Sequence, residues 1–175
     1  MVSFTILLFF ALTGITLNHQ AAFSGDPKTQ LFRGSLDALW LKTPEAHKDD
    51  IVKAFRSRHR VKAALSDFRV DGDQVQLSFK GPGYAADGFV DRATGKYEMN
   101  ESRLGFIAVI NDLHKGRDTG AAWSGVIDLS AGLMTAVSVT GLVLIFFLNK
   151  RLRAGLYALA IGAAVCYLVY VIWVP

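Results

Sequence analysis

The sequence predicts a membrane α-helical protein with three transmembrane helices and a small α+β domain inserted between the first helix and the second. Two observations predict this fold class: the chain contains three apolar runs, and its charged residues are segregated between them. Although 51% of the residues are hydrophobic, 19% are charged. Residues 20–124 hold 16 of the 19 Lys and Arg and 14 of the 15 Asp and Glu, whereas 1–18 and 154–175 carry no charge. We therefore expect a polar domain outside the bilayer.

The three apolar runs cover residues 2–17, 126–148 and 154–174. A helix needs about 20 apolar residues to cross the ~30 Å hydrocarbon core, so the first run is at the short end. A secretory signal peptide is the alternative for this run, although no basic segment precedes it and the following residues are a poor cleavage site. We expect either a first helix that continues N-terminal to this sequence or a modest uncharged leader.

The connection between the second and third runs sets the expected topology. Residues 149–153 read Asn-Lys-Arg-Leu-Arg, and the positive-inside rule places such a short basic loop in the cytoplasm. The expected order is a first helix at 1–19, an external domain at 20–124, a second helix at 125–148, the cytoplasmic loop and a third helix at 154–175. The N-terminus then lies inside, and the domain and C-terminus lie outside.

Turn and alternation signals predict one helix and two hairpins in the domain. Thr43 and Pro44 suit the N-cap and first position of a helix, which we expect to end near His59. The turns at 71–73 and 92–95 predict hairpins of 65–70 with 74–80 and of 88–91 with 96–99. The apolar segment 104–113 predicts a last helix that leads towards the membrane. His47 lies with His59 among charged residues, and we expect both to be solvated.

Three segments resemble the PepSY-associated transmembrane helix proteins of bacterial inner membranes. The first run ends in ALTGITLNH, the second hairpin reads VDRATGKY, and NDLHKGRDTG precedes a span that contains VTGLVL. These are similar to the family's Thr-Gly helix with terminal Asn-His, its Asp-x-x-Thr-Gly hairpin and its Leu-His-x-Gly segment. The family's Arg-x-x-His before the first helix is absent here, which removes any His from the inner end of that helix.

The resemblance implies two alternative functions. Larger relatives are associated with iron uptake, ferric-siderophore reduction and flavin-linked electron transfer across the inner membrane, and some are thought to carry b-type haem between membrane histidines. Soluble PepSY modules are instead linked to holding or inhibiting peptidases. A shared fold does not choose between these functions.

The sequence lacks the complete motifs of several catalytic classes. No Cys-x-x-Cys-His, His-Glu-x-x-His, Walker loop or Gly-x-Gly-x-x-Gly occurs in the sequence. Cys166, the only cysteine, lies in the third run and is interpreted as a small apolar filler. We therefore expect an accessory subunit, while a role as a reductase component stays open.

Two histidines are candidate cofactor ligands. His19 follows the first run, and His114 lies twelve residues before the second, so the expected topology puts both at the outer side of the membrane. An axial pair of imidazoles can hold the iron of a b-type haem. Simple polar anchoring at the interface is the alternative interpretation.

A polar cluster is expected where the second run begins. Asp128 is the only charge in 126–148, and a carboxylate at that depth is costly unless it has a partner or water. We expect an interfacial cluster of Asp128, Arg117 and Asp112, to which Lys115 or His114 could also contribute. Proton transfer or support of a cofactor is the alternative role.

Two Thr-Gly pairs occur in matching contexts, ALTGITL and SVTGLVL. Small residues let helices approach closely, and Thr can donate a hydrogen bond across the contact. We therefore predict that Thr13, Gly14, Thr140 and Gly141 pack helices against each other or against a partner.

Two function hypotheses follow. The first is an inner-membrane accessory protein that supports iron uptake or flavin- or haem-linked electron transfer. The second is a non-catalytic membrane scaffold whose external domain binds or regulates a partner protein or peptidase. The expected partners are the lipid bilayer and another membrane or periplasmic protein. Nucleic acid is excluded, because a domain with 16 basic and 14 acidic residues has ordinary surface charge.

Overall fold

The structure is a computed structural model that describes all residues except 24, 46, 148–151 and 175. The chain forms two compact units. The domain unit comprises Thr5–Ile127, and the helical unit comprises Met1–Phe4 together with Asp128–Pro175. Each unit is described by itself below.

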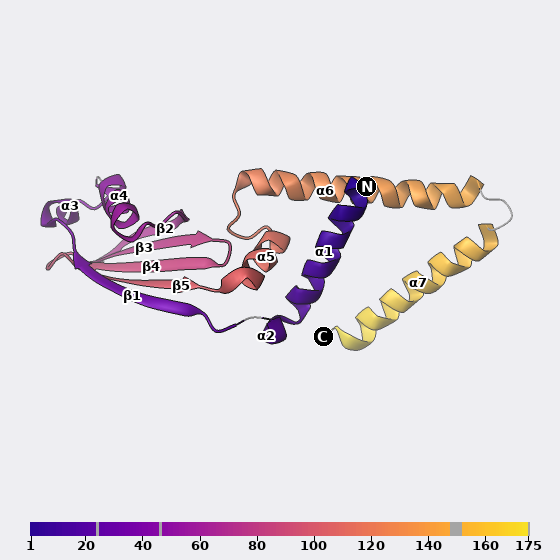
Figure 1. The fold of residues 1–175 in the computed structure, drawn as a ribbon, viewed down its shortest axis with the longest axis horizontal. Coiled ribbons are helices and arrows are strands. Elements are labelled where there is room, and N and C mark those ends of the chain that lie inside the picture. The colour runs from indigo at the N-terminus through magenta and orange to yellow at the C-terminus, as the bar shows by residue number, and fades with distance from the viewer. Residues whose placement is uncertain (24, 46, 148–151, 175) are drawn as a thin grey trace. The chain divides into compact units, whose positions relative to one another are not determined.

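A five-stranded antiparallel sheet with the order β1-β5-β4-β3-β2 forms the centre of the domain unit (Figure 1). Strands β2 to β5 are a meander, and β1 pairs with β5 at one edge. Both predicted hairpins are confirmed, and the Gly-Pro-Gly at 81–83 makes a third tight turn between β3 and β4. The strands are β1 (Lys28–Ser35), β2 (Ala64–Asp71), β3 (Gln74–Gly81), β4 (Tyr84–Asp91) and β5 (Lys96–Arg103).

Helix α4 (Lys48–His59) covers one face of the sheet, and the hydrophobic core lies between them. Ile51 and Phe55 share one face of α4 because they are four residues apart. The Phe55 ring lies 4.7 Å from that of Tyr97. A Cβ atom at Gly88 would come within 3.0 Å of Phe55, so the glycine permits this close approach. Burial of these apolar side chains holds α4 on the sheet.

The sequence missed three elements, among them the four-residue helix α2 (Gln20–Phe23), and misplaced the start of a fourth. Strand β1 is exposed at six of its eight positions, so it has no alternating apolar pattern and depends on backbone pairing with β5. The short helix α3 (Ala38–Lys42), capped by Asp37, was not predicted either. Helix α4 begins at Lys48 rather than near Pro44, because Pro44 is buried in the turn that follows α3. Ala46, part of the predicted helix start, lies outside the described residues.

The prediction that His59 is solvated was wrong. Its Nε2 lies 2.9 Å from the Tyr97 hydroxyl, and its ring lies 4.9 Å from that of Phe32. Burial, followed by the neighbouring Arg58 charge, lowers the pKa of His59 below its ordinary value, and Glu101 opposes this shift. The ring is therefore part of the edge of the core.

Helices α6 (Ala121–Phe147) and α7 (Leu152–Trp173) are long and apolar enough to cross a membrane. Their 27 and 22 residues correspond to about 40 Å and 33 Å at ~1.5 Å per residue. Helix α1 (Val2–Asn18) is apolar but shorter, with 17 residues or about 25 Å. The expected basic loop at 149–153 falls largely outside the described residues, so the topology stays a prediction.

The lowered pKa of His59 predicts a pH-dependent stability. In the unfolded chain His59 takes up a proton near pH 6.5, whereas in the folded protein it does so only at lower pH. The free energy of unfolding is therefore unaffected by this residue's titration above about pH 6.5 and falls as the pH drops below that value. We expect His59→Gln to flatten the fall in the urea unfolding midpoint between about pH 7.5 and 5. His47→Gln is the control, because this histidine lies outside the core, with its Nδ1 3.3 Å from an Asp50 carboxylate oxygen. Parallel curves for His59→Gln and the wild type would contradict this account.

Candidate functional site

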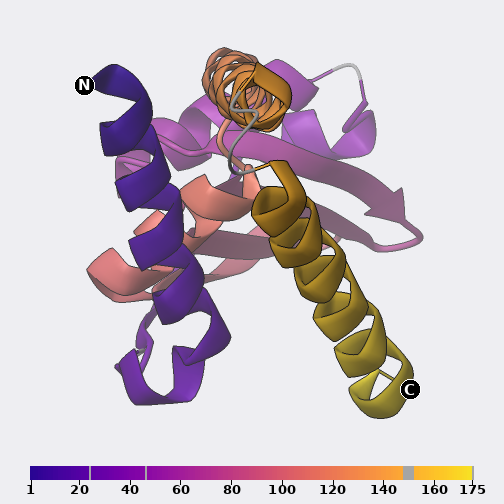
Figure 2. The same ribbon diagram turned by 90° about the vertical axis from the view of Figure 1, so that its right-hand side faces the viewer.

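Helix α5 (Gly105–Lys115) carries the polar side chains that join the sheet to α1. Glycines with positive φ flank it: Gly105 has φ 81° and Gly116 has φ 68°. The Gly116 amide donates to the carbonyl oxygens of Asp112 and Leu113 and closes the helix. Asn111 and His114 are three residues apart and therefore share one face. Figures 1 and 2 both show α1 beside α5.

The first contact between these helices joins Thr13 and His114. The Thr13 hydroxyl oxygen lies 2.6 Å from His114 Nδ1, and the hydroxyl donates to the Phe9 carbonyl oxygen at 2.7 Å. Because the hydroxyl has one hydrogen, donation to Phe9 leaves it to accept from His114 Nδ1–H. This arrangement favours the tautomer of His114 in which Nε2 carries the lone pair.

A second contact lies one turn further along α1. The Thr16 hydroxyl oxygen lies 3.0 Å from Asn111 Oδ1 and 2.9 Å from the Thr13 carbonyl oxygen of its own helix, so its single hydrogen is shared between these two acceptors. Asn111 and Thr13 are both buried, with 3% and 4% exposure, so their polar groups need these partners. Since Thr16 meets Asn111 and Thr13 meets His114, α1 and α5 run antiparallel. Gly14 also faces α5, because a Cβ atom there would lie 3.7 Å from His114 Cε1.

Asp112 ties the sheet to the same helix. Its Oδ2 accepts from the Gly83 amide at 2.8 Å, and its Oδ1 accepts from Arg117 Nη2 at 2.9 Å. A Cβ atom at Gly83 would come within 2.6 Å of Val109, and Gly83 has φ 64°, so only glycine fits this turn. We call Thr13, Thr16, Asn111, Asp112, His114 and Arg117, with Gly83, the α1–α5 junction.

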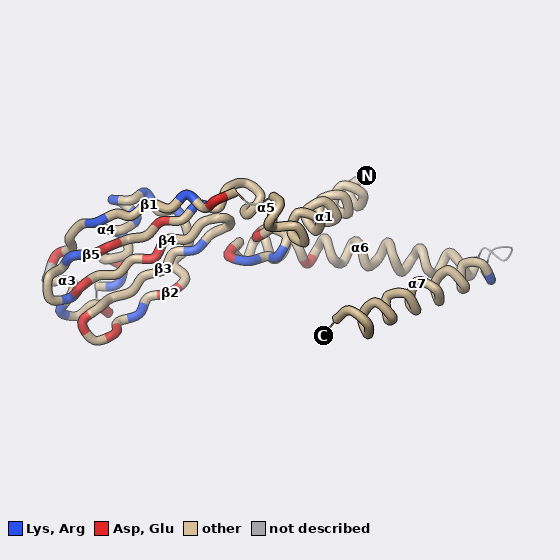
Figure 3. The backbone as a smooth tube through the Cα atoms, turned by 90° about the horizontal axis from the view of Figure 1, so that it is seen from below, with Lys and Arg blue, Asp and Glu red and all other residues tan. Residues whose placement is uncertain are grey.

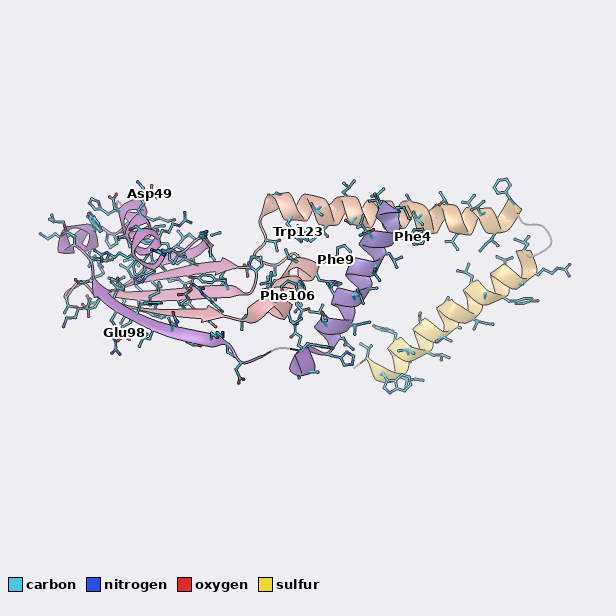
Figure 4. The ribbon with its side chains drawn as sticks, in the orientation of Figure 1. Phe4, Phe9, Asp49, Glu98, Phe106 and Trp123 are labelled. Atoms are coloured by element: carbon cyan, nitrogen blue, oxygen red, sulfur yellow. The ribbon has the colours of Figure 1, made fainter. Side chains whose placement is uncertain are left out.

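The first turn of α6 is held to the junction by a further hydrogen bond. The Trp123 indole N–H donates to the Leu113 carbonyl oxygen at 2.8 Å. A Cβ atom at Gly116 would come within 2.9 Å of Ile127, which shows how closely the connection packs. Figure 4 labels Trp123 at this end of α6. The segment that leads to α6 is therefore fixed to α5.

The structure places the other predicted site residues outside the junction. His19 is exposed, and its Nδ1 lies 3.1 Å from the Ile15 carbonyl oxygen of its own helix. No contact between His19 and His114 occurs within the described part of the chain. Asp128 is exposed in the helical unit, so the cluster found here is Asp112 with Arg117, and the place of Asp128 in it stays a prediction.

The second Thr-Gly pair is exposed on α6. The Thr140 hydroxyl donates to the Val137 carbonyl oxygen of the same helix at 3.0 Å. Within the described residues, no atom lies within 4 Å of a Cβ built at Gly141, other than its own helix backbone and chain neighbours. The packing role predicted for this pair therefore stays a prediction, whereas Thr13 and Gly14 face α5.

Sequence reasoning found most junction residues but not their arrangement. It did not single out Thr16, Asn111 or Gly83 as site residues, and it interpreted Gly83 only as part of a turn. The pairing of Asn111 with Thr16, 95 residues apart, has no local signal. Among the described residues, no three His, Cys, Asp or Glu side chains come together as a metal site.

The five-stranded sheet with one covering helix, followed by two helices of membrane length, defines a membrane protein with a small α+β domain. Within that class, the model of the PepSY_TM-like family matches residues 1–175, and the chain belongs to this family. The resemblance seen in the sequence is thereby confirmed. Comparisons with curated proteins and with solved structures found no match.

The junction predicts that the Asp112 carboxylate stabilises the domain unit. Asp112→Asn replaces one acceptor oxygen with an amide that cannot accept, which leaves the Gly83 amide or Arg117 without its partner. We expect a loss of about 2 kcal/mol, or about 4–8 °C in the midpoint of thermal unfolding. Asp118→Asn is the matched control, because Asp118 lies 4.0 Å from the same Arg117 and is more exposed. Equal effects of the two substitutions would refute the assignment.

Proposed function

We propose that this protein is a membrane-anchored accessory protein whose PepSY-like domain binds a partner protein or peptide through the open face of its sheet. The α1–α5 junction holds that domain at its membrane helix. In this proposal α1, α6 and α7 lie in a bacterial inner membrane, with the domain and the C-terminus in the periplasm. The chain acts as a scaffold and needs no catalytic centre of its own.

The observation that carries the proposal is the uncovered face of the sheet. Figure 4 shows Asp49 on α4 and Glu98 on β5 at opposite sides of the sheet. Leu31 pairs with Asn100, and Phe89 pairs with Glu98, so these side chains share the face opposite α4. Leu31 is 55% exposed and Phe89 47% exposed. Two apolar side chains on an otherwise polar open sheet suit a protein or peptide surface.

The junction supports the anchoring part of the proposal. Thr13, Asn111 and Asp112 are buried polar groups, and each makes a hydrogen bond that joins α1, α5 or the β3–β4 turn. A domain joined in this way presents its open face at a defined position relative to α1. This geometry suits a protein that positions a partner near the membrane.

Photocrosslinking in cells tests this proposal. We expect a photoreactive phenylalanine analogue at Phe89 to give a discrete adduct of higher mass. The same analogue at Lys53, an exposed position on α4, should not give that adduct. Adducts of equal yield at both positions, or none at Phe89, would contradict partner binding at the open face.

A second candidate function is iron-linked or haem-linked electron transfer, and the histidine tautomers favour it. Nδ1 of His19 can only donate to a carbonyl oxygen, and Nδ1 of His114 donates to Thr13. Each neutral imidazole therefore has its lone pair on Nε2, the form in which a histidine ligates a metal. His114 fits a ligand role, whereas His19 lies six residues, or about 9 Å, further along α1 than Thr13.

An absorption spectrum of the full chain in mild detergent tests this second candidate. Bound b-type haem would give a Soret band that shifts on dithionite reduction and is lost in His114→Ala. His47→Ala is the control, because His47 lies on the loop before α4. A band that His114→Ala leaves unchanged would contradict ligation by His114, and a featureless spectrum would contradict the candidate function.

A further inference from the structure

The sheet of the domain unit has a cluster of basic residues at one end, which we call its basic end. The start of β1, the end of β3, the end of β5 and the connection before β2 all lie at the end of the sheet next to α5. The basic residues there are Lys28, Arg60, Lys62, Lys80 and Arg103. The opposite end carries a mixture of charges: Asp37, Asp71, Asp73 and Asp91 on one hand, and Lys42, Arg92 and Lys96 on the other. Figure 3 shows acidic residues gathered near the β2–β3 turn, away from α5.

A groove opens at this basic end. Its walls are Arg60 and Lys62, the turn at 81–83 with Tyr84, Arg103, and the first turns of α5 at Gly105 and Val109. Its volume of about 670 Å³ is in the range of small-molecule and headgroup sites. The groove walls include three cationic side chains and no carboxylate.

A buried carboxylate orients one of these cations. Glu101 has a side chain that is 3% exposed, and its Oε1 accepts from Arg103 Nη2 at 2.6 Å. The rest of the Arg103 guanidinium is exposed and lies 5.9 Å from the centre of the Tyr84 ring. Burial, followed by the neighbouring Glu101 charge, raises the pKa of Tyr84 to about 12, so this residue adds no negative charge to the groove.

The other two cations have no counter-charge. Within the described part of the chain, neither Arg60 nor Lys62 forms an ion pair. With Arg103 neutralised by Glu101, the groove keeps two uncompensated positive charges. A phosphate carries the complementary charge, and Arg and Lys are the side chains that bind it.

The groove lies close to the end of α1. Asn111 lies beside Thr16, to which it is hydrogen-bonded. Gly105 precedes Asn111 by six residues on α5, a distance along the helix of at most about 9 Å. Because α5 runs antiparallel to α1, Gly105 is displaced from Asn111 in the direction in which α1 ends. Helix α1 ends at Asn18, two residues or about 3 Å beyond Thr16. The groove wall therefore extends about 6 Å beyond the end of α1. The headgroup layer of a bilayer has a similar thickness of about 5–7 Å on each side.

We propose that this groove binds the phosphate of an anionic phospholipid headgroup and so seats the basic end of the domain on the membrane surface. The inference rests on the proposed membrane placement of α1 and is independent of partner binding at the open sheet face. Arg60 and Lys62 supply the charge, and Arg103 supplies an oriented guanidinium. The opposite end of the sheet then points away from the lipid.

The test uses the full chain in mild detergent, titrated with dioctanoylphosphatidylglycerol by isothermal titration calorimetry. We expect Arg60→Gln with Lys62→Gln to weaken binding roughly thirtyfold, or about fivefold for each cation. Lys42→Gln with Lys96→Gln removes the same charge at the other end of the sheet and should change the affinity less than twofold. Lys62→Glu is a second variant of the groove and should also weaken binding, because it reverses the charge of one groove cation.

Four results would overturn the proposal. Equal binding of dioctanoylphosphatidylcholine would show that the groove does not select a net anionic headgroup. Displacement of the lipid by inorganic phosphate at similar concentration would assign the groove to free phosphate. Equal losses in the two double variants would show that only the total charge matters. Unchanged affinity in both groove variants would place the lipid elsewhere. None of these results bears on crosslinking at Phe89, so the two proposals fail separately.

Discussion

The Asp112 carboxylate is the point at which the sheet, α5 and the connection to α6 meet. One oxygen accepts from the Gly83 amide at the β3–β4 turn, and the other accepts from Arg117 beyond the end of α5. Burial of a carboxylate destabilises the folded protein unless both of its oxygens accept hydrogen bonds. The turn and the helix must therefore keep the arrangement in which both oxygens do so. The contacts of α5 with Thr13 and Thr16 depend on that arrangement, because they require α5 to present Asn111 and His114 towards α1.

This constraint links the sheet to α1 through polar contacts, beside which the Phe10 ring packs against that of His114 at 5.2 Å. Apolar surfaces alone do not favour helix pairing in lipid, whereas a hydroxyl that meets an imidazole or an amide selects a register. The same arrangement brings the basic end of the sheet close to the end of α1. In the two proposals above, the open sheet face binds a partner, the junction holds the domain at α1 and the basic groove binds lipid headgroups.

The local part of this structure could be predicted from the sequence, and the long-range part could not. The Asp-Gly-Asp and Ala-Thr-Gly turns have their own chemistry, so both hairpins were predicted correctly, as was the helix that ends at Lys115. Strand β1 gives no such signal, because an exposed edge strand needs only a backbone partner.

His59 resembled a surface residue because its neighbours in sequence are charged, whereas its neighbours in space are Tyr97 and Phe32. Thr13, Gly14, His114, Asp112 and Arg117 were singled out from the sequence, but their arrangement was not, because partners such as Thr13 and His114 lie up to 101 residues apart.

A double-mutant cycle between Thr13 and His114 tests the central claim that the junction joins α1 to the domain. The cycle compares Thr13→Val, His114→Phe and the double variant in the full chain, with the free energy of unfolding measured in mild detergent. Direct contact predicts a coupling energy of about 1 kcal/mol between the two substitutions. Additive effects, with no coupling beyond about 0.3 kcal/mol, would show that the two side chains do not interact and would contradict the account.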